Sequence, residues 1–177
     1  MTSDLTKKKS KENFRRNSNY QNSKSLKDRL IKISRVSKVT KGGKKLSFQA
    51  IVVVGNQKGQ VGVGVAKADD VVNAFKKAKI DGQKNLIKLQ MTKSLSIPHN
   101  VIGEFGACKV IMRPSIEGSG VIAGGSVRIV LEVAGIKNII AKQLGSKNLL
   151  NNARASICAL KNLTTKSQVV KNRSLNS

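Results

Sequence analysis

The sequence predicts an α+β protein in which two small domains follow one another along the chain. In the first half, alternating apolar and polar residues form runs separated by glycine-rich turns, and an amphipathic helical pattern follows them. The second half again combines short apolar runs with helical patterns. We therefore expect a β-β-β-α domain over residues 26–89 and an α/β domain over 97–163. A disordered basic arm (1–25) should precede them and a polar basic tail (164–177) should follow.

The N-terminal elements follow from the number and spacing of the apolar residues. Residues 1–25 carry too few large apolar side chains to offset the entropy of ordering them, which predicts disorder. Leu26, Leu30 and Ile33 recur every three or four residues. This spacing predicts a short helix or turn before a strand at 35–41.

A glycine pair punctuates the first strand pattern. Gly42–Gly43 predicts a hairpin turn, because paired glycines supply the positive φ values that two-residue turns require. The return strand is expected over 45–54 and a third strand over 60–66. Asp69 is expected to cap a helix that runs to about Leu89 with one apolar face on the sheet.

The second domain is expected to begin with paired strands at 101–105 and 109–112. A segment of small residues, 114–125, leads into a helix over 126–134, which Gly135 ends. The remaining predicted elements are a strand over 136–144 and a helix over 148–163.

The charge of the chain indicates a polyanionic partner. Its 177 residues include 34 Lys or Arg and 9 Asp or Glu, a formal net charge of +25 that repels itself in a compact fold. Nucleic acid is the first candidate partner and an anionic membrane surface the second. No apolar run is long enough to span a bilayer, so no membrane-inserted segment is expected. With no Trp, one Tyr and four Phe, binding should depend on charge and shape rather than on base stacking.

Catalytic and metal chemistry finds little support in the residues present. Cys108 and Cys158 have no neighbouring His and are expected to be buried thiols, and His99 has no nearby group to orient it as a base. No metal, cofactor or enzyme activity is therefore expected. The glycine-rich segment 59–64 alternates with valines and is expected to be a strand that another element approaches closely. A second such segment, 118–125, precedes a helix as a phosphate loop does, which leaves a small-molecule kinase of galactokinase-like type as the enzyme alternative.

The hairpin is the strongest candidate binding element. Its cationic side chains surround a glycine turn that an RNA backbone can approach closely, and such side chains pair with phosphates without reading sequence. The charge is concentrated there, since the first 45 residues hold 15 basic and 3 acidic side chains. The basic residues of the hairpin are Arg35, Lys38, Lys41, Lys44 and Lys45.

Several motifs occur in an order that resembles one known family. In the first half they are Arg35–Lys44, Val52–Gly55 and the glycine-valine segment Gly59–Ala68. From Leu26 to Leu163 the sequence is similar to the bacterial-type small-subunit ribosomal protein five family, and it looks most like the plastid and cyanobacterial members. The matching motifs of the second half are Arg113-Pro114, Glu117-Gly118, Gly120–Gly125, Arg128 and Leu131–Gly135.

The resemblance implies a double-stranded-RNA-binding-like first domain and a second domain with the galactokinase-like fold but no catalysis. It implies a structural constituent of the small ribosomal subunit that binds 16S-type rRNA, helps to assemble the junction of body and head, and supports translational accuracy. The partners that it implies are small-subunit proteins four and eight, and messenger RNA near the place where it enters. The positions implied to contact rRNA are Arg35, Lys38, Lys41, Gly42, Gly43, Lys44, Lys45 and Lys58. Those implied to contact a partner protein are Pro114, Glu117, Gly118 and Arg128.

A plastid origin is expected from two further observations. The segments Lys142–Ser146 and Asn151–Ala155 look closest to plastid and cyanobacterial members of the family. The 15 Asn residues, together with abundant Lys and Ile, suggest an AT-rich genome. The expected location is the ribosome of the plastid (chloroplast) stroma, with a bacterial cytoplasm as the alternative. Besides the kinase, a free double-stranded-RNA-binding protein remains an alternative function.

Overall fold

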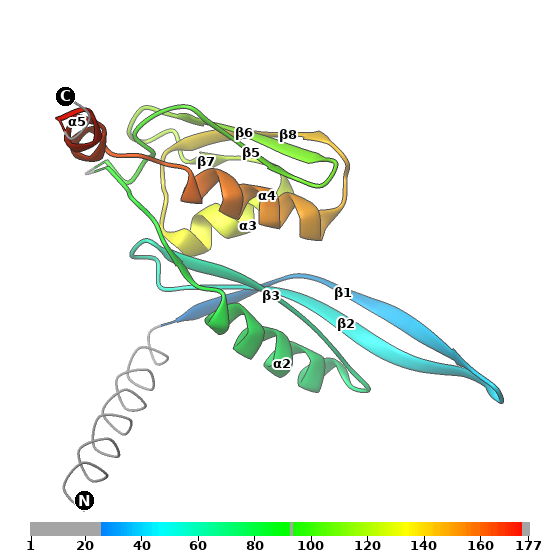
Figure 1. Cartoon of the computed structure of the whole chain (residues 1–177). Coiled ribbons are helices and arrows are strands. Elements are labelled where there is room, and N and C mark those ends of the chain that lie inside the picture. Colours follow the sequence, from blue (N-terminus) through cyan, green and yellow to red (C-terminus); the bar gives the residue numbers. More distant parts are fainter. Residues whose placement is uncertain (1–25, 93, 175–177) are drawn as a thin grey trace, which may run out of the picture.

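The computed structural model describes residues 26–92 and 94–174, which form four layers (Figure 1). Helix α2 (Val71–Lys84) covers one face of a first sheet. Helices α3 (Gly125–Ala134) and α4 (Leu149–Lys161) cover its other face, and a second sheet lies beyond them. The predicted α+β class with two successive domains is confirmed. The disordered arm predicted before Leu26 lies outside the described residues.

The first sheet is antiparallel, with its strands in the order β1-β2-β3-β4. We call its α2 side the helix face and its α3/α4 side the junction face. The three consecutive antiparallel strands that the glycine turns predicted are present, and a short fourth strand adds to them. The strands are β1 Lys27–Thr40, β2 Gly43–Gly55, β3 Gln60–Ala68 and β4 Ile87–Lys88.

The predicted helix or turn near Leu26 is wrong, because Leu30 and Ile33 lie in the first half of β1 and Leu26 comes directly before it. A β-bulge explains the misleading spacing: Leu30 pairs with Val52 and Lys32 pairs with Ile51, so Ile31 is an extra residue. Leu30 and Ile33 thereby reach the same face of the sheet although they are three residues apart. A spacing of three, which usually indicates a helix, here results from a strand with an inserted residue.

Helix α2 is shorter than predicted at both ends. Its N-cap is Asp70 rather than Asp69, and the Asp70 side chain makes no capping hydrogen bond. Its C-cap is Asn85, after which the chain turns back. Ile87, expected within the helix, pairs with Val61 at the edge of the sheet.

The second sheet has the strand order β5-β6-β8-β7. The paired strands predicted at 101–105 and 109–112 are confirmed. The strand predicted at 136–144 is also present, although it begins at Ile139. The two-residue strand β7 was not predicted, and it pairs in parallel with β8 inside the segment expected to be a glycine-rich loop. The bounds are β5 Val101–Phe105, β6 Cys108–Pro114, β7 Val121–Ile122 and β8 Ile139–Gly145.

The helices of the second half agree with the predictions more closely. Gly135 ends α3 in the left-handed conformation, with φ of +93°, as a C-terminal glycine should.

The predicted polar tail, however, contains helix α5 (Lys166–Ser174), none of whose residues is buried. Thr165 N–H donates to Gln168 Oε1 at 3.1 Å and Gln168 N–H donates to Thr165 Oγ1 at 3.4 Å, a capping box that starts this helix. No helix in the described part is long and apolar enough to cross a membrane.

Strand β2 supplies both cores of the molecule. Ala50, Val52 and Val54 are fully buried on the helix face, where they pack with α2. Ile51 and Val53 point to the junction face and belong to the larger core, which includes α3 and α4. Because full burial of a valine or isoleucine side chain contributes roughly 1.5–3 kcal/mol, this strand joins the two domains firmly.

Glycines in β3 let α2 approach the sheet. A Cβ added to Gly64 would collide with the backbone of Ala78 and Gly82 in α2, and one added to Gly62 would collide with the backbone of Gly82. The expectation of a glycine-bearing strand that permits close approach is therefore confirmed. Val61 and Val63, which alternate with these glycines, point to the opposite face and enter the larger core.

Replacing Gly64 with Ala should destabilise the protein by roughly 2–3 kcal/mol, because the added methyl meets backbone that cannot rotate away. The midpoint of urea-induced unfolding, followed by circular dichroism, measures the change.

Gly125→Ala is the matched control, because a Cβ at Gly125 meets nothing within 4 Å. It should leave stability unchanged or raise it slightly, since alanine favours a helix. Equal midpoints for the two variants would contradict the close approach of α2.

Candidate nucleic-acid interface

The β1–β2 hairpin projects beyond the rest of the first sheet. Strand β3 pairs with β2 only as far as the pair of Phe48 and Ala68. In the described part of the chain, residues 36–40 and 43–47 therefore form a two-stranded ribbon with no third strand beside it. The ribbon extends clear of both domains (Figure 1). Both faces of its tip are accessible to a partner.

Lys41 and Gly42 form the turn of the hairpin, because Thr40 pairs with Gly43. The turn thus lies one residue earlier than the predicted Gly42–Gly43 pair. Only Gly43 needs the conformational freedom of glycine, with φ of +140°. Thr40 Oγ1 donates a hydrogen bond to the Gly43 carbonyl at 3.1 Å. A Cβ at either glycine would meet nothing within 4 Å, so the surface here is open to close approach.

The structure brings the five predicted cations to this hairpin but divides them between its two faces. Residues paired across two strands lie on the same face. Lys38 pairs with Lys45 on the junction face. Arg35 and Lys44 lie on the helix face, and Lys41 is at the turn. All five side chains are exposed.

The opposition of Lys38 and Lys45 leaves a local excess of positive charge. Like charges directly opposite each other destabilise a strand pair. The only acid beside them in the described residues is Asp69, whose Oδ1 lies 3.7 Å from Lys45 Nζ and accepts from Ser47 Oγ at 3.4 Å. This ion pair is exposed, with side-chain exposures of 67% and 72%, so its stabilisation is small. An external anion is the natural complement of this site.

The helix face of the hairpin is partly apolar, which the sequence analysis did not predict. Leu30 and Ile33 are 39% and 36% exposed, and Val39 and Leu46 are 73% and 53% exposed. The alternation of these residues with cations along each strand was the available signal. The hairpin therefore presents one cationic face and one mixed face.

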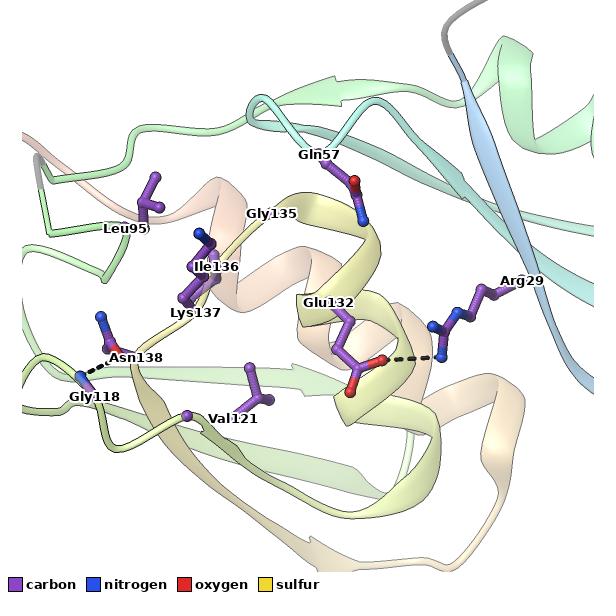
Figure 2. A pocket seen from close by; sticks show the side chains of 11 residues that line it. Arg29, Gln57, Leu95, Gly118, Val121, Glu132, Gly135, Ile136, Lys137 and Asn138 are labelled. Carbon is purple, nitrogen blue, oxygen red and sulfur yellow. Dashed lines mark hydrogen bonds and ion pairs between the residues drawn. The ribbon is translucent and has the colours of Figure 1, made fainter.

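Three of the predicted partner-contact residues lie in one loop of the second domain. Pro114 ends β6, and Glu117 and Gly118 follow it, all exposed. Gly118 N–H donates to Asn138 Oδ1 at 3.1 Å, which fixes the loop (Figure 2). Ile116, between them, is 85% exposed and was missed by the sequence analysis.

The fourth residue, Arg128, belongs to an ionic network at the domain boundary. Its Nε lies 2.8 Å from Glu132 Oε1 within α3. Glu132 Oε2 lies 3.0 Å from Arg29 Nη1 in β1, so the same carboxylate links the two domains (Figure 2). Both carboxylate oxygens are thus satisfied inside the molecule. The acid that lines the adjacent pocket already has two partners, which favours a structural role for this place.

The comparisons with known proteins match both halves of the chain. The model described as "Ribosomal protein S5, N-terminal domain" matches residues 26–90, and "Ribosomal protein S5, C-terminal domain" matches residues 103–173.

The chain belongs to the ribosomal protein S5 family.

Curated relatives agree over nearly the whole length. Small ribosomal subunit protein uS5c of Phaeodactylum tricornutum is 79% identical over 176 residues, which cover 99% of each chain. That of Cyanophora paradoxa is 63% identical over 82% of this chain and 86% of its own. Small ribosomal subunit protein uS5 of Acaryochloris marina is 57% identical over 93% and 94%. The predicted resemblance is confirmed.

Membership of this family settles three questions. The chain is a protein of the small ribosomal subunit and lies in the ribosome with rRNA. The expectation of no enzyme activity is confirmed, since the relatives are named as ribosomal proteins, and the kinase alternative is wrong. The expected plastid location is confirmed by relatives that carry the plastid form of the name, uS5c.

The other residues considered for chemistry have structural surroundings. Cys108 is buried and Cys158 only half-buried, so the second thiol was predicted incorrectly. Thr164 N–H donates to His99 Nε2 at 3.2 Å, which ties the chain after α4 to the start of the second domain. In the described ranges, no three or more His, Cys, Asp or Glu side chains come together in a group that could hold a metal ion.

Lys58, a predicted rRNA contact of this S5 protein, does not join the hairpin. It is exposed in the turn between β2 and β3, at the other end of the first sheet. This turn caps α3, since Gln57 N–H donates to Val133 O at 3.1 Å and Gly59 N–H to Ala134 O at 3.0 Å. Contact of Lys58 with rRNA would therefore be a separate event.

Replacing Lys38 with Thr should slow hydrogen exchange of the ribbon amides in the free protein, because it removes the opposed charge. The free energy of opening of the ribbon should rise by about 0.2–1 kcal/mol at low salt, and this increase should become smaller as salt screens the repulsion. Native-state hydrogen exchange of residues 36–40 and 43–47 measures it.

Lys67→Thr is the matched control, because Lys67 lies on the same face but pairs with Gln49. If both variants slowed exchange equally, the repulsion between Lys38 and Lys45 would not be the cause.

Proposed function

We propose that the β1–β2 hairpin binds phosphates of small-subunit rRNA, and that the protein thereby helps to assemble the junction of body and head and supports translational accuracy. The observation that carries this proposal is the projecting ribbon with Lys38 opposite Lys45 and no sufficient acid beside them. A protein that lies among phosphates has no need to neutralise these charges itself. The hairpin contacts are Arg35, Lys38, Lys41, Gly42, Gly43, Lys44 and Lys45.

The chemistry of the ribbon favours backbone contacts over base reading. Lysines form point-like contacts with phosphate oxygens, and the open surface at Gly42 and Gly43 lets a backbone come close. Val39 and Leu46 on the helix face supply apolar area that is buried once the ribbon enters a crevice. This combination suits a loop that is inserted between RNA segments.

The loop after β6 is proposed as the surface for protein partners, with small-subunit protein four at Pro114, Glu117, Gly118 and Arg128 and protein eight as a further neighbour. Ile116 supports it, because a side chain that is 85% exposed gains from burial against another protein. Messenger RNA near the place where it enters is proposed as a further neighbour of the same protein.

The alternative of a free double-stranded-RNA-binding protein is wrong, because the chain belongs to a family of small-subunit ribosomal proteins. In magnesium-rich plastid extracts the full-length chain should therefore sediment with the small subunit and should not remain in the light fractions.

Replacing Lys41, Lys44 and Lys45 with Ala should weaken binding to a transcript of plastid small-subunit rRNA. Each phosphate that the variant no longer binds should reduce the slope of log affinity against log salt by about 0.7–0.9. Filter binding over a series of salt concentrations measures both quantities.

The control carries Lys137→Ala, Lys161→Ala and Lys166→Ala, which remove the same charge from exposed positions of the second half. It should change the slope much less. An unchanged slope in the hairpin variant would refute a phosphate-binding hairpin.

A further inference from the structure

A groove lies where the junction face of the first sheet meets the second domain. Lys32 and Ser34 of β1 and Gln49 of β2 line one side. Lys147 and Asn148, just before and at the start of α4, line the other, and Ile51 and two leucines of α4 complete the lining. We call this feature the junction groove. Its polar rim comes from both domains.

The junction groove continues the cationic face of the hairpin. Lys32, Ser34 and Lys38 all lie on the junction face of β1. Val36 stands between the last two, but its partner across the strands is the polar Ser47. At each step from the ribbon to the groove, at least one of the two strands therefore presents a polar side chain. Along this face the pairs of β1 and β2 are Lys32 with Ile51, Ser34 with Gln49, Val36 with Ser47, and Lys38 with Lys45.

The charge of the junction groove is positive and uncompensated. None of the residues that line it is acidic. Lys32 and Lys147 are exposed, and neither takes part in any of the ion pairs found between described residues. By contrast, Arg29, Lys79 and Lys109 each have a carboxylate within 3.0 Å. The lysines of the groove differ from these in having no carboxylate partner among the described residues.

We propose that the junction groove binds the sugar-phosphate backbone of an rRNA segment that also contacts the hairpin, so that both domains hold the same RNA. Lysine, serine, glutamine and asparagine side chains are among the usual donors to phosphate and sugar oxygens. A protein partner is the less favoured occupant, because the lining of the groove contains none of the Trp, Tyr and Arg side chains in which protein-binding hot spots are enriched. The proposal rests on the proposed function of the hairpin and extends it to the second domain.

The test compares two double variants of the full-length chain in binding to a transcript of plastid small-subunit rRNA. Lys32→Ala with Lys147→Ala should reduce the salt slope by about 0.7–0.9 for each phosphate that is no longer bound. Lys137→Ala with Lys161→Ala, which removes the same charge away from the groove, should leave the slope nearly unchanged. Equal thermal unfolding midpoints confirm that all variants fold, as expected for exposed side chains.

The outcomes separate this proposal from that for the hairpin. If the hairpin variant loses affinity but the groove variant matches its control, the groove does not bind RNA and the hairpin proposal stands. If neither the hairpin variant nor the groove variant differs from its control, both proposals are wrong. A loss of affinity in both variants, with the two slope changes adding, supports two sets of phosphate contacts.

A single charge reversal tests the second domain alone. Lys147→Glu should weaken binding to the transcript more than Lys161→Glu, at the opposite end of α4. If Lys147→Glu leaves affinity for the transcript unchanged but reduces co-sedimentation with the assembled small subunit, the groove binds a protein and the proposal is wrong.

Discussion

Burial of both faces of one strand is the constraint on which the rest of the structure depends. Alternate residues of β2 point in opposite directions, so Val52 completes the core with α2 while Val53 completes the core with α3 and α4. Neither helix α2 nor the second domain can be removed without exposing a row of apolar side chains on this sheet. The second domain is thus held at one place on the first by the hydrophobic effect, and hydrogen bonds from the β2–β3 turn to Val133 and Ala134 fix its orientation.

The projecting ribbon is supported by this packed sheet. A two-stranded hairpin is marginally stable alone, but here its strands continue into a sheet that is packed on both sides. The Arg29 and Glu132 ion pair adds a polar contact between the same two layers. The ribbon therefore extends from a sheet that is packed on both faces and tied to the second domain by an apolar core, hydrogen bonds and an ion pair.

Local signals predicted the strands well and their pairing poorly. Glycine turns and alternation located the strands from 45 to 66, because both signals lie within a few residues of each element. Pairing depends on the position of the turn, and a turn displaced by one residue changes every pair. With the turn at Gly42–Gly43, Lys41 would face Lys44. With the turn at Lys41–Gly42, as in the structure, Lys38 faces Lys45 instead. The junction groove could not be predicted from the sequence, since Lys32 and Lys147 line the same groove only because the two domains pack together. Helix α5 was within reach, because Thr165 and Gln168 have the spacing of a capping box.

The extra residue in β1 has a consequence for the length of this strand. Asp28, whose Oδ1 lies 2.6 Å from Lys79 Nζ in α2, and Arg29, bound to Glu132 in α3, point to opposite faces. The bulge takes up Ile31 without changing the partners on either side of it, since Leu30 pairs with Val52 and Lys32 with the adjacent Ile51. β1 is therefore one residue longer than the stretch of β2 with which it pairs, yet Asp28 and Arg29 face the same helices that they would face in a regular strand. A one-residue insertion or deletion in β1 keeps both ion pairs when a bulge takes up the difference, whereas the same change within the regular pairing would turn over every residue on one side of it.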